Sequence, residues 1–478
     1  MRSGCRRDGA SAERHGVSAR VLVAGAGISG LAAAWDLMRA GVDVTVIEAT
    51  GEAGGVVGSW DVDGYSFENG PAAVQGNALA FRSLVQDLGL EDQVVTASAD
   101  HRERHLYYKG SMKKLPRTFR DFFASKLFTA GQKTRAVMEP WVRAGRPDRE
   151  ETVAEFFGRR VGRGVTMTWV DVIVSGVYAG NPNRLGIRSA FPDLADMEAE
   201  HGSILKGMRS RERERRDDAG RVVPSPLWSL RGGLGAAVQK MVADLGDRIR
   251  YNCRVTNIVR RPGGGLQVGL TSDTGDEVVE PDRMILAVSA ATAGILIAPL
   301  APDAADLLFE VESSPLIVAQ AGFDREQLPG LPKGYGYLVP RCTRLRTLGW
   351  IFESQLFPER APEGKVAMCG FLGGILDPHA IDQPDEVTRH LLLGELALAL
   401  GQRKLPIPEV FRIVRWKNRL PQYNVGHLRR MVAVRRLVEK DVPEVALAGN
   451  WIEGITVDAC VKRGREAAQE SLDALPVA

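Results

Sequence analysis

Three glycines near the start of the chain have the spacing of a phosphate-binding turn. Gly25, Gly27 and Gly30 form a Gly-x-Gly-x-x-Gly motif, with Ile28 and Ser29 between the last two. The first glycine of such a motif allows a tight turn, the second lets backbone amides approach a pyrophosphate, and the third lets a helix pack closely on a sheet. The helix N-terminus adds free N–H groups and partial positive charge. The motif therefore predicts a bound nucleotide.

The residues around these glycines predict the elements that such a turn needs. Residues 21–24 form an apolar run typical of a buried strand, and helix-forming residues follow Gly30. Residues 42–47 predict a second strand. This strand ends at Glu48, about 20 residues beyond the glycines, where an acidic side chain binds ribose hydroxyls. A glycine-rich turn without a ligand is the alternative, but the full strand, helix, strand and acid pattern favours a dinucleotide.

A second group of glycines continues this site. Ala49 follows the acid, and Gly54 and Gly55 come shortly after it. An acid followed by a Gly-Gly pair at this spacing resembles the FAD-containing superfamily of amine oxidases and porphyrinogen oxidases. The resemblance implies FAD as the cofactor. Many members have arginine or a bulky residue directly after the pair, where this chain has Val56.

The resemblance assigns further cofactor contacts along the chain. It implies that a turn at Gly70 and Pro71 crosses beneath the flavin. It also implies that the backbone of Val255 holds the adenine and that a buried strand ending near Ala287 returns to the nucleotide. Trp416 is expected beside the isoalloxazine ring.

A strand, turn and helix near the C-terminus predict a second anion site. The turn and the first residue of the helix are expected to face the flavin ring and the ribityl phosphate, through Gly449, Asn450, Gly454, Ile455 and Val457. The family often has an Asn-Asp or Pro-Asp pair here, whereas this chain has Asp458-Ala459. Cys460 lacks the Ser-Gly-Gly-Cys context of covalent amine oxidases, so FAD is expected to be noncovalent.

Two further segments narrow the resemblance to the porphyrinogen oxidases. Residues 176–180 read Gly-Val-Tyr-Ala-Gly, and residues 421–427 read Pro-Gln-Tyr-Asn-Val-Gly-His. The family implies oxidation of protoporphyrinogen IX to protoporphyrin IX in haem biosynthesis, by six electrons in three two-electron steps. Flavin takes hydride from a methylene bridge, and dioxygen reoxidises it to hydrogen peroxide. The cofactor performs the redox step, so no catalytic side chain is required, and His427 is expected to be structural.

Five residues are expected to bind this tetrapyrrole. In the family, a hairpin arginine pairs with a substrate propionate, and Arg104 matches it, although Arg102 or Lys109 could serve and a solvated arginine is the plain alternative. Glycine at 176 would let a carbonyl face a flat macrocycle. The family sandwiches the macrocycle between side chains of two strands, and the candidates are Tyr335, Leu338 and Phe371. Ordinary core packing explains these three equally well.

Other functions remain open from the sequence. Coproporphyrinogen III oxidation uses the same fold and a substrate with four propionates instead of two, so its pocket should be larger and more basic. A flavin amine oxidase or a desaturase is a further alternative. From another class, the chain could be a flavin-binding chaperone or a non-catalytic relative.

The repeated return to strand, glycine and helix predicts an α/β fold with a discontinuous Rossmann-like FAD-binding domain. This domain is expected to comprise residues 20–85, 225–305 and 410–478. A β-rich substrate domain is expected from residues 95–116 and 306–409. A helical domain is expected over residues 117–220, after a disordered, Arg-rich leader at 1–19.

Composition excludes several classes of protein. The 62 basic and 59 acidic residues leave a net charge of +3, too small to indicate nucleic-acid binding, and the charge run at 209–218 is expected to be a solvated loop. Five scattered cysteines without a Cys-x-x-Cys pair favour a reducing, cytoplasmic compartment, and no metal site is expected. Phenylalanines interleaved with basic residues at 119–133 fit either core packing or peripheral membrane contact. A homodimer is left open.

Overall fold

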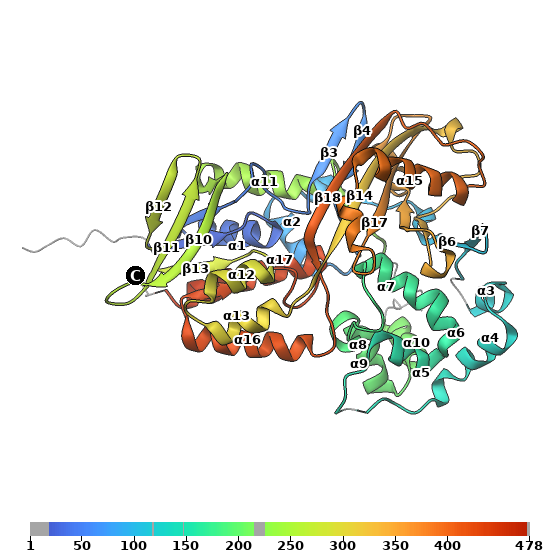
Figure 1. The fold of residues 1–478 in the computed structure, drawn as a ribbon, viewed down its shortest axis with the longest axis horizontal. Coiled ribbons are helices and arrows are strands. Elements are labelled where there is room, and N and C mark those ends of the chain that lie inside the picture. The colour runs from blue at the N-terminus through green and yellow to red at the C-terminus, as the bar shows by residue number, and fades with distance from the viewer. Residues whose placement is uncertain (1–18, 117–118, 147, 215–224, 476–478) are drawn as a thin grey trace, which may run out of the picture.

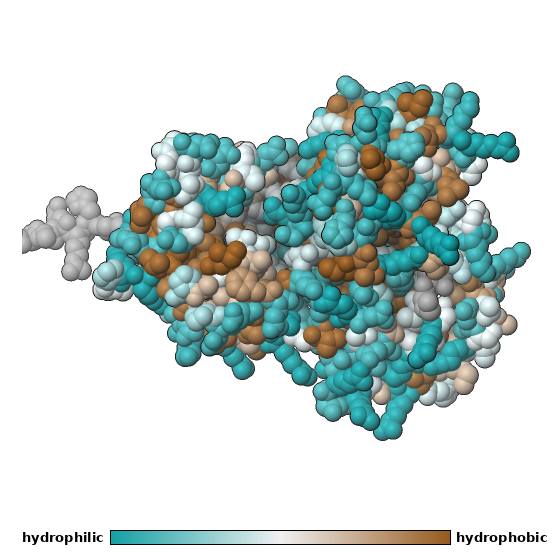
Figure 2. All heavy atoms as spheres, in the orientation of Figure 1, coloured by the Kyte–Doolittle hydropathy of each residue, from teal (hydrophilic) through white to brown (hydrophobic). Residues whose placement is uncertain are grey.

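In the computed structural model, which describes residues 19–116, 119–146, 148–214 and 225–475, the elements form three groups (Figure 1). One group is a parallel sheet with its helices, the second is a large mixed sheet, and the third is a cluster of helices. Figure 2 shows hydrophilic residues over most of one face of the molecule, with hydrophobic residues in small separate patches. Residues 1–18 of the predicted leader lie outside the described residues.

The predicted nucleotide-binding sheet is present and has five strands. Its order is β19-β13-β1-β2-β9, and every neighbouring pair is parallel. The strands come from three separate stretches of the chain, as the α/β prediction with a discontinuous domain required. They are β1 (Arg20–Ala24), β2 (Asp43–Ile47), β9 (Ile249–Arg250), β13 (Arg283–Leu286) and β19 (Val445–Leu447).

Helices bury both faces of this sheet. Side chains alternate along each strand, so neighbouring residues pack against helices on opposite faces. Val21 and Val23 of β1 pack on one side with α1 (Ile28–Arg39), α2 (Leu79–Asp87), α11 (Gly235–Leu245) and α17 (Val457–Asp473). Leu22 and Ala24 pack on the other side with α12 (Ala290–Ile297), α13 (Pro302–Phe309) and α16 (His427–Asp441). The carboxyl ends of the strands are therefore where a ligand can approach.

Three smaller sheets connect this core to the rest of the chain. An antiparallel sheet of three strands packs against α12, with a turn at residues 263–265 between its first two strands. Its strands are β10 (Cys253–Arg260), β11 (Leu266–Ser272) and β12 (Gly275–Val279). The other two are antiparallel pairs: β3 (Ser59–Val62) and β4 (Tyr65–Glu68) form a hairpin, and β5 (Val94–Thr96) pairs with the distant β8 (Trp228–Leu230).

The β-rich region is a seven-stranded mixed sheet with the order β18-β14-β17-β16-β15-β6-β7. The strands are β6 (Arg104–Tyr108), β7 (Ser111–Lys114), β14 (Ser313–Asp324), β15 (Gly336–Leu338), β16 (Thr347–Ile351), β17 (Lys365–Gly373) and β18 (Val410–Pro421). The sequence placed residues 410–478 in the nucleotide-binding part. The first strand of that range, β18, instead pairs with β14 along its length, and each of the two strands has 12 residues.

The two faces of this sheet have different partners. One face packs against α15 (Asp385–Ala399), and the short helix α14 (Glu353–Leu356) precedes β17 in the chain. The other face carries side chains that pack with β4 and with the helical region. This second face is therefore the one turned toward the nucleotide-binding part.

The helices of the third group fall in the range predicted for the helical region. They are α3 (Phe119–Ala124), α4 (Ala130–Val137), α5 (Val153–Val161), α6 (Arg163–Val165), α7 (Asp171–Tyr178), α8 (Ile187–Ala190), α9 (Pro192–His201) and α10 (Ile204–Glu214), with a π-helical turn at Thr166–Val170. The charge run expected to be a loop is helical through residue 214, where Arg211 pairs with Asp193. No helix in the described part of the chain combines the length and apolar character needed to cross a bilayer.

A buried ion pair holds the helical group together. Arg160 and Glu139 are fully buried, and their charged atoms lie 3.0 Å apart. Glu139 also accepts hydrogen bonds from the Ser203 hydroxyl at 2.5 Å and from the Ile204 amide at 2.9 Å, at the start of α10. One carboxylate thus neutralises a buried cation and caps a helix.

Replacing Glu139 with alanine should destabilise the protein by about 3–5 kcal/mol, because it leaves the Arg160 charge buried with less compensation. Chemical denaturation and limited proteolysis of the helical region would measure the loss. Glu200→Ala, at a side chain that is 67% exposed, is the matched control. Equal stability of the two variants would contradict this account.

Candidate functional site

Two helix N-termini meet at the carboxyl edge of the parallel sheet. β1, β13 and β19 run side by side and in the same direction, so the turns that follow them lie at one edge. α1 begins after the first turn and α17 begins after the last. A Cβ on Gly464 of α17 would lie 2.2 Å from the carbonyl oxygen of Ser29 in α1, so the two helices touch through their backbones. The first and last predicted cofactor segments therefore converge.

The structure gives a different reason for glycine at each of the three motif positions. Gly25 has φ +100°, and a Cβ there would lie 2.6 Å from the carbonyl oxygen of Ala287. A Cβ on Gly30 would lie 2.0 Å from the carbonyl oxygen of Gly25. Gly27 has an ordinary φ of −69°, and a Cβ there would meet no described atom within 4 Å. The chain itself requires the first and third glycines, whereas open space beside the second fits the phosphates of a bound nucleotide.

The acid at the end of β2 is fixed beside this turn. One carboxylate oxygen of Glu48 accepts a hydrogen bond from the Ala26 amide at 2.9 Å, and the other accepts from the Thr50 amide and hydroxyl at 2.9 and 2.8 Å. The Gly54 amide donates to the Ala26 carbonyl at 2.7 Å. Gly54 and the next residue, Gly55, have φ of +100° and +62°, which favour glycine. Ala49 is exposed directly after the acid.

The adenine side of the predicted site gathers around the same acid. The amide of Cys253, at the start of β10, donates to the Glu48 carbonyl at 2.9 Å. Val255 lies two residues further on, with its side chain buried and a register shift just after it. The Ala287 amide donates to the Ala24 carbonyl at 2.8 Å, which places it at the carboxyl edge. The role of Val255 at an adenine stays a prediction.

The turn predicted to cross beneath the flavin is tied to the seven-stranded sheet. The indole N–H of Trp416 donates to the Asn69 carbonyl at 2.8 Å. The amide of Gln320 donates to the Glu68 carbonyl at 2.9 Å and to the Asn69 side chain at 3.1 Å. Gly70 follows, where a Cβ would lie 2.6 Å from the Val56 carbonyl, and Pro71 comes next. Trp416 therefore lies beside the turn at Gly70 and Pro71, and their contacts with a flavin stay predictions.

The C-terminal turn is held from both sides. The Asn450 amide donates to the Arg419 carbonyl at 2.8 Å, and the Tyr423 hydroxyl donates to the Asn450 carbonyl at 2.6 Å. Gly449 has φ +133°, and the Thr456 hydroxyl caps α17 by accepting from the Ala459 amide at 3.1 Å. These contacts hold the residues predicted around the flavin ring, namely Gly449, Asn450, Gly454, Ile455 and Val457, in a fixed turn.

Cys460 is poorly suited to covalent attachment. It lies in the first turns of α17, and its thiol is buried beside the Ser29 side chain. Burial raises the pKa of this thiol to about 12, so the nucleophilic thiolate is disfavoured. The site therefore fits a noncovalently held flavin.

Three of the predicted substrate residues share one face of the seven-stranded sheet. Leu338 pairs with Gly349, and Gly349 pairs with Phe371, so the two side chains stand on the same face two strands apart. Leu338 also pairs with Leu106, and Arg104 lies two residues before Leu106 on β6. These residues form one wall. Leu338 and Phe371 lie about 10 Å apart on it, the spacing of two strands. The expected sandwich between these two side chains is therefore replaced by a shared wall.

The remaining substrate candidates adjoin this wall. A Cβ on Gly176 of α7 would lie 3.0 Å from a methyl carbon of Leu338, so the helix backbone approaches the wall closely. The guanidinium of Arg104 lies 5.0 Å from the centre of the Tyr335 ring, a cation–π contact. Lys109 sits in the β6–β7 turn, 5.4 Å from the centre of the Tyr108 ring, and Tyr108 packs in the same cluster as Leu106 and Leu338. Both cations thus lie beside the same strand, and the role of Arg104 at a propionate stays a prediction.

Several residues of this region were missed by sequence reasoning. Gln320 and Asn69 join the two sheets, and a buried group of Glu68, Glu353 and Arg360 lies beside them. Glu68 and Asn69 directly precede the turn predicted at Gly70 and Pro71, but no local pattern connects them to partners more than 250 residues away.

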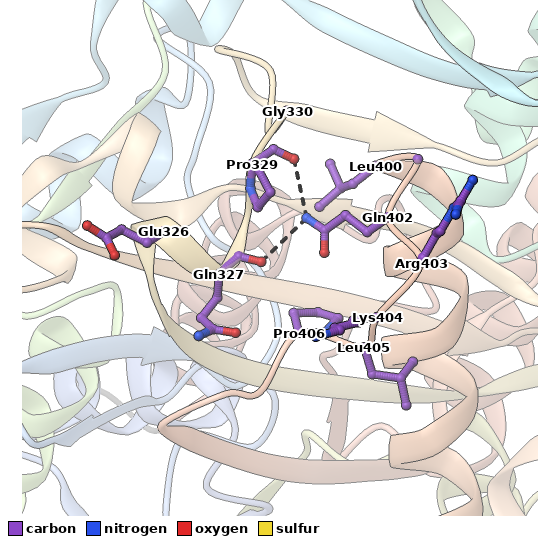
Figure 3. A pocket seen from close by; sticks show the side chains of 11 residues that line it. Glu326, Gln327, Pro329, Gly330, Leu400, Gln402, Arg403, Lys404, Leu405 and Pro406 are labelled. Atoms are coloured by element: carbon purple, nitrogen blue, oxygen red, sulfur yellow. Dashed lines mark hydrogen bonds between the residues drawn. The ribbon is translucent and has the colours of Figure 1, made fainter.

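A surface cavity of about 590 Å³ lies elsewhere, between the turn Arg325–Gln327 and the loop after α15. Figure 3 shows the Gln402 amide within this cavity, donating to the carbonyls of Gln327 and Pro329 at 3.4 and 3.2 Å. None of the predicted cofactor or substrate residues lines it. It is therefore separate from the candidate site.

His427 supports the C-terminal turn from behind. It is fully buried and stacks on Tyr423, with ring centres 4.1 Å apart, and Tyr423 in turn binds the Asn450 carbonyl. Burial lowers the pKa of His427 to about 4. The imidazole is therefore neutral and structural.

The folded protein should lose stability as pH falls from 6.5, the ordinary value for histidine, to about 4. Over this range the unfolded chain binds a proton at residue 427 and the folded chain does not, which costs about 3 kcal/mol in unfolding free energy. His427→Phe keeps the stacked ring and should lose this part of the pH dependence in denaturant titrations. His379→Phe, at an exposed histidine, should keep it. Parallel pH curves for wild type and His427→Phe would contradict the assignment.

Comparisons with known proteins agree with this geometry. Protoporphyrinogen oxidase of Homo sapiens is 31% identical over 486 residues, covering 95% of this chain and 99% of that protein. Coproporphyrinogen III oxidase of Bacillus subtilis (strain 168) is 26% identical over 466 residues, covering 95% and 97%. Chloroplastic protoporphyrinogen oxidase of Nicotiana tabacum is 28% identical over 468 residues, covering 94% and 84%.

Solved structures show the same fold at lower identity. A crystal structure of a protein from Exiguobacterium sp. 255-15 gives a TM-score of 0.82 at 24% identity, covering 96% of this chain and 99% of that chain. Putrescine oxidase bound to putrescine gives 0.68 at 18% identity, with the same coverage of 96% and 99%. The family model described as flavin containing amine oxidoreductase matches residues 28–472. The chain therefore belongs to the flavin-containing amine oxidoreductase family and is a flavin-dependent oxidoreductase.

Proposed function

We propose that this protein binds FAD noncovalently and oxidises protoporphyrinogen IX to protoporphyrin IX, with dioxygen as acceptor and hydrogen peroxide as product. The observation that carries the proposal is one juxtaposition. The turn at Gly70, tied to Trp416, lies beside the apolar sheet face that carries Phe371, Leu338 and Arg104. A flat apolar tetrapyrrole with carboxylate side chains needs such a wall with a cation at its edge. The relatives of this chain include proteins named for this activity.

Bound FAD supplies the hydride acceptor, and the chain supplies binding and orientation. Glu48 accepts from the ribose hydroxyls, and the turn at Gly27 with the start of α1 binds the pyrophosphate. The turn from Gly449 to Val457 contacts the flavin end. The sheet face presses the macrocycle toward this end and excludes water, while Arg104 pairs with a propionate.

Coproporphyrinogen III is the second candidate substrate, because relatives with that activity in their name match the chain at similar length. It carries four propionates, so its binding would need more cations at the wall. Amine oxidases share the fold as well, among them putrescine oxidase.

The deciding experiment follows porphyrin fluorescence with purified yellow protein. It compares protoporphyrinogen IX with coproporphyrinogen III and monitors peroxide release. We expect faster turnover of protoporphyrinogen. A faster reaction with coproporphyrinogen would establish the second candidate. A yellow protein inert toward both would reject a porphyrinogen oxidase.

We also propose a peripheral contact with the cytoplasmic face of a membrane. The support is a set of exposed apolar side chains on the helical region, with basic residues beside them. Trp141, Met138 and Phe123 are 78%, 52% and 51% exposed. The Lys133 ammonium donates a hydrogen bond to the Phe123 carbonyl. Such a mixture suits the interface of an anionic bilayer.

Gly27→Val should give a folded but colourless protein. Residue 27 has an ordinary backbone φ, and a Cβ there meets no described protein atom. The new side chain therefore meets only the bound pyrophosphate. Flavin absorbance and thermal unfolding of the flavin-free protein would measure the two properties. Gly30→Ala is the matched contrast, since its Cβ meets a backbone oxygen at 2.0 Å and should impair folding itself. A yellow Gly27→Val protein would move the pyrophosphate away from this turn.

Arg104→Ala should raise the KM for protoporphyrinogen roughly tenfold to a hundredfold, the loss expected for a charge-assisted hydrogen bond. Flavin content should stay unchanged, because Arg104 lies on the seven-stranded sheet and not among the predicted cofactor residues. Steady-state kinetics would measure the effect. Lys109→Ala, in the adjacent turn, should leave KM unchanged, and the reverse result would transfer the role to Lys109.

A further inference from the structure

One helix of the helical region lies directly against the predicted substrate wall. α7 packs on the seven-stranded sheet through Val172, which shares a hydrophobic cluster with Leu106 and Leu338. Its opposite face packs on the rest of the helical region through Val174 and Tyr178. In Figure 1, α7 accordingly lies between the seven-stranded sheet and the other helices of that region. The position of α7 therefore limits the space on the wall beside Leu338.

The end of α7 is held by three segments that follow strands of the large sheet. The carbonyls of residues 178, 179 and 180 accept hydrogen bonds from the Gln422 side chain at 2.9 Å, the Ile375 amide at 2.8 Å and the Arg341 guanidinium at 2.8 Å. These donors follow β18, β17 and β15 in the chain. Carbonyls at the end of a helix have no partner within the helix, and a cation also suits its partial negative charge.

Arg341 also holds the start of the same helix. Its Nε lies 3.6 Å from one carboxylate oxygen of Asp171, the first residue of α7, and its backbone amide donates to the other oxygen at 3.3 Å. The two side chains are only 26% and 16% exposed, so solvent screens this ion pair less than a surface pair. The plane of a guanidinium can serve two acceptors at once, which a lysine ammonium does less well. One arginine thus binds both ends of α7.

The same arginine is joined closely to the wall. Arg341 comes three residues after Leu338 in the chain, and Gly176, in the second half of α7, is the residue that approaches Leu338. A Cβ on Gly176 would lie 3.0 Å from a methyl carbon of Leu338. Because Arg341 ties residues 171 and 180 to the segment that carries Leu338, it fixes where the Gly176 backbone stands against the wall.

We propose that Arg341 is a positioning residue for the tetrapyrrole substrate. By holding both ends of α7, it fixes the space that the helix leaves on the wall for a flat macrocycle. The proposal rests on the proposed function, in which this wall binds the substrate. The helix partners of Arg341, Asp171 and Gly180, are not among the predicted cofactor residues, so its effect should fall on substrate binding and leave flavin content unchanged.

Amide hydrogen exchange tests the positioning without any substrate. In the flavin-loaded protein, Arg341→Ala should raise the exchange rate of residues 172–178 about tenfold or more, the loss expected for hydrogen bonds to a charged group. Arg341→Lys keeps a charge beside Asp171 without the guanidinium plane that also reaches Gly180, so an intermediate rate is expected. Arg344→Ala, at an exposed arginine of the same turn, is the matched control and should exchange as wild type. Unchanged exchange in Arg341→Ala would overturn the proposal.

Porphyrin affinity and kinetics test the substrate role. Arg341→Ala should raise the Kd for protoporphyrin IX, measured by fluorescence titration of the holoenzyme, and the KM for protoporphyrinogen IX, each about tenfold. The kcat should stay within about threefold of wild type, since the lost binding is common to the ground state and the transition state. Arg341→Lys should recover part of the affinity, and it carries the same comparison if Arg341→Ala fails to fold. Faster exchange in α7 with unchanged Kd and KM would make Arg341 merely structural and refute the proposal.

Failure of the proposed function would give a different result. Wild-type protein that neither binds protoporphyrin IX nor oxidises either porphyrinogen would refute the proposed function and, with it, a tetrapyrrole as the ligand of this wall. The exchange rates would still decide whether Arg341 holds α7, because that measurement uses no porphyrin.

Discussion

The whole site depends on a close backbone contact between two helices, made where α17 has a glycine. Gly30 of α1 lies against the Gly25 carbonyl oxygen, and Gly464 of α17 lies against the Ser29 carbonyl oxygen. Both approaches are closer than a Cβ would permit. This contact brings two helix N-termini to the same edge of the parallel sheet. Because each N-terminus presents free N–H groups and partial positive charge, the edge is suited to a ligand with more than one anionic group.

A second set of interactions fixes the seven-stranded sheet relative to that edge. Gln320 and Trp416 of this sheet hold the backbone at residues 68–69, and Arg360 holds the Glu68 side chain. Since Gln320, Glu68 and Arg360 are buried, removing one of them would leave polar atoms without partners. The wall and the cofactor turn are therefore positioned by the same few polar contacts, which also place a buried acid between them.

The fold alone does not select a substrate, since putrescine oxidase and this chain share it. We propose that selection lies in the side chains of the sheet face. Leu338 and Phe371 give a flat apolar surface, Gly176 lets a helix approach it without a side chain, and Arg104 supplies charge at its margin. These features suit a large planar molecule with carboxylates better than a slender amine.

The sequence by itself determined the parts that depend on local order: the strand–glycine–helix turn, the acid at residue 48, the discontinuous α/β core and the helical insertion. Each of these follows from neighbouring residues and their periodicity. The tertiary structure alone decided that β18 joins the large sheet, that Leu338 and Phe371 stand on one face of that sheet, and that Glu68 pairs with Arg360, 292 residues away. Strand pairing and buried charge compensation are set by the spatial neighbours of a residue, and a linear pattern does not contain that information.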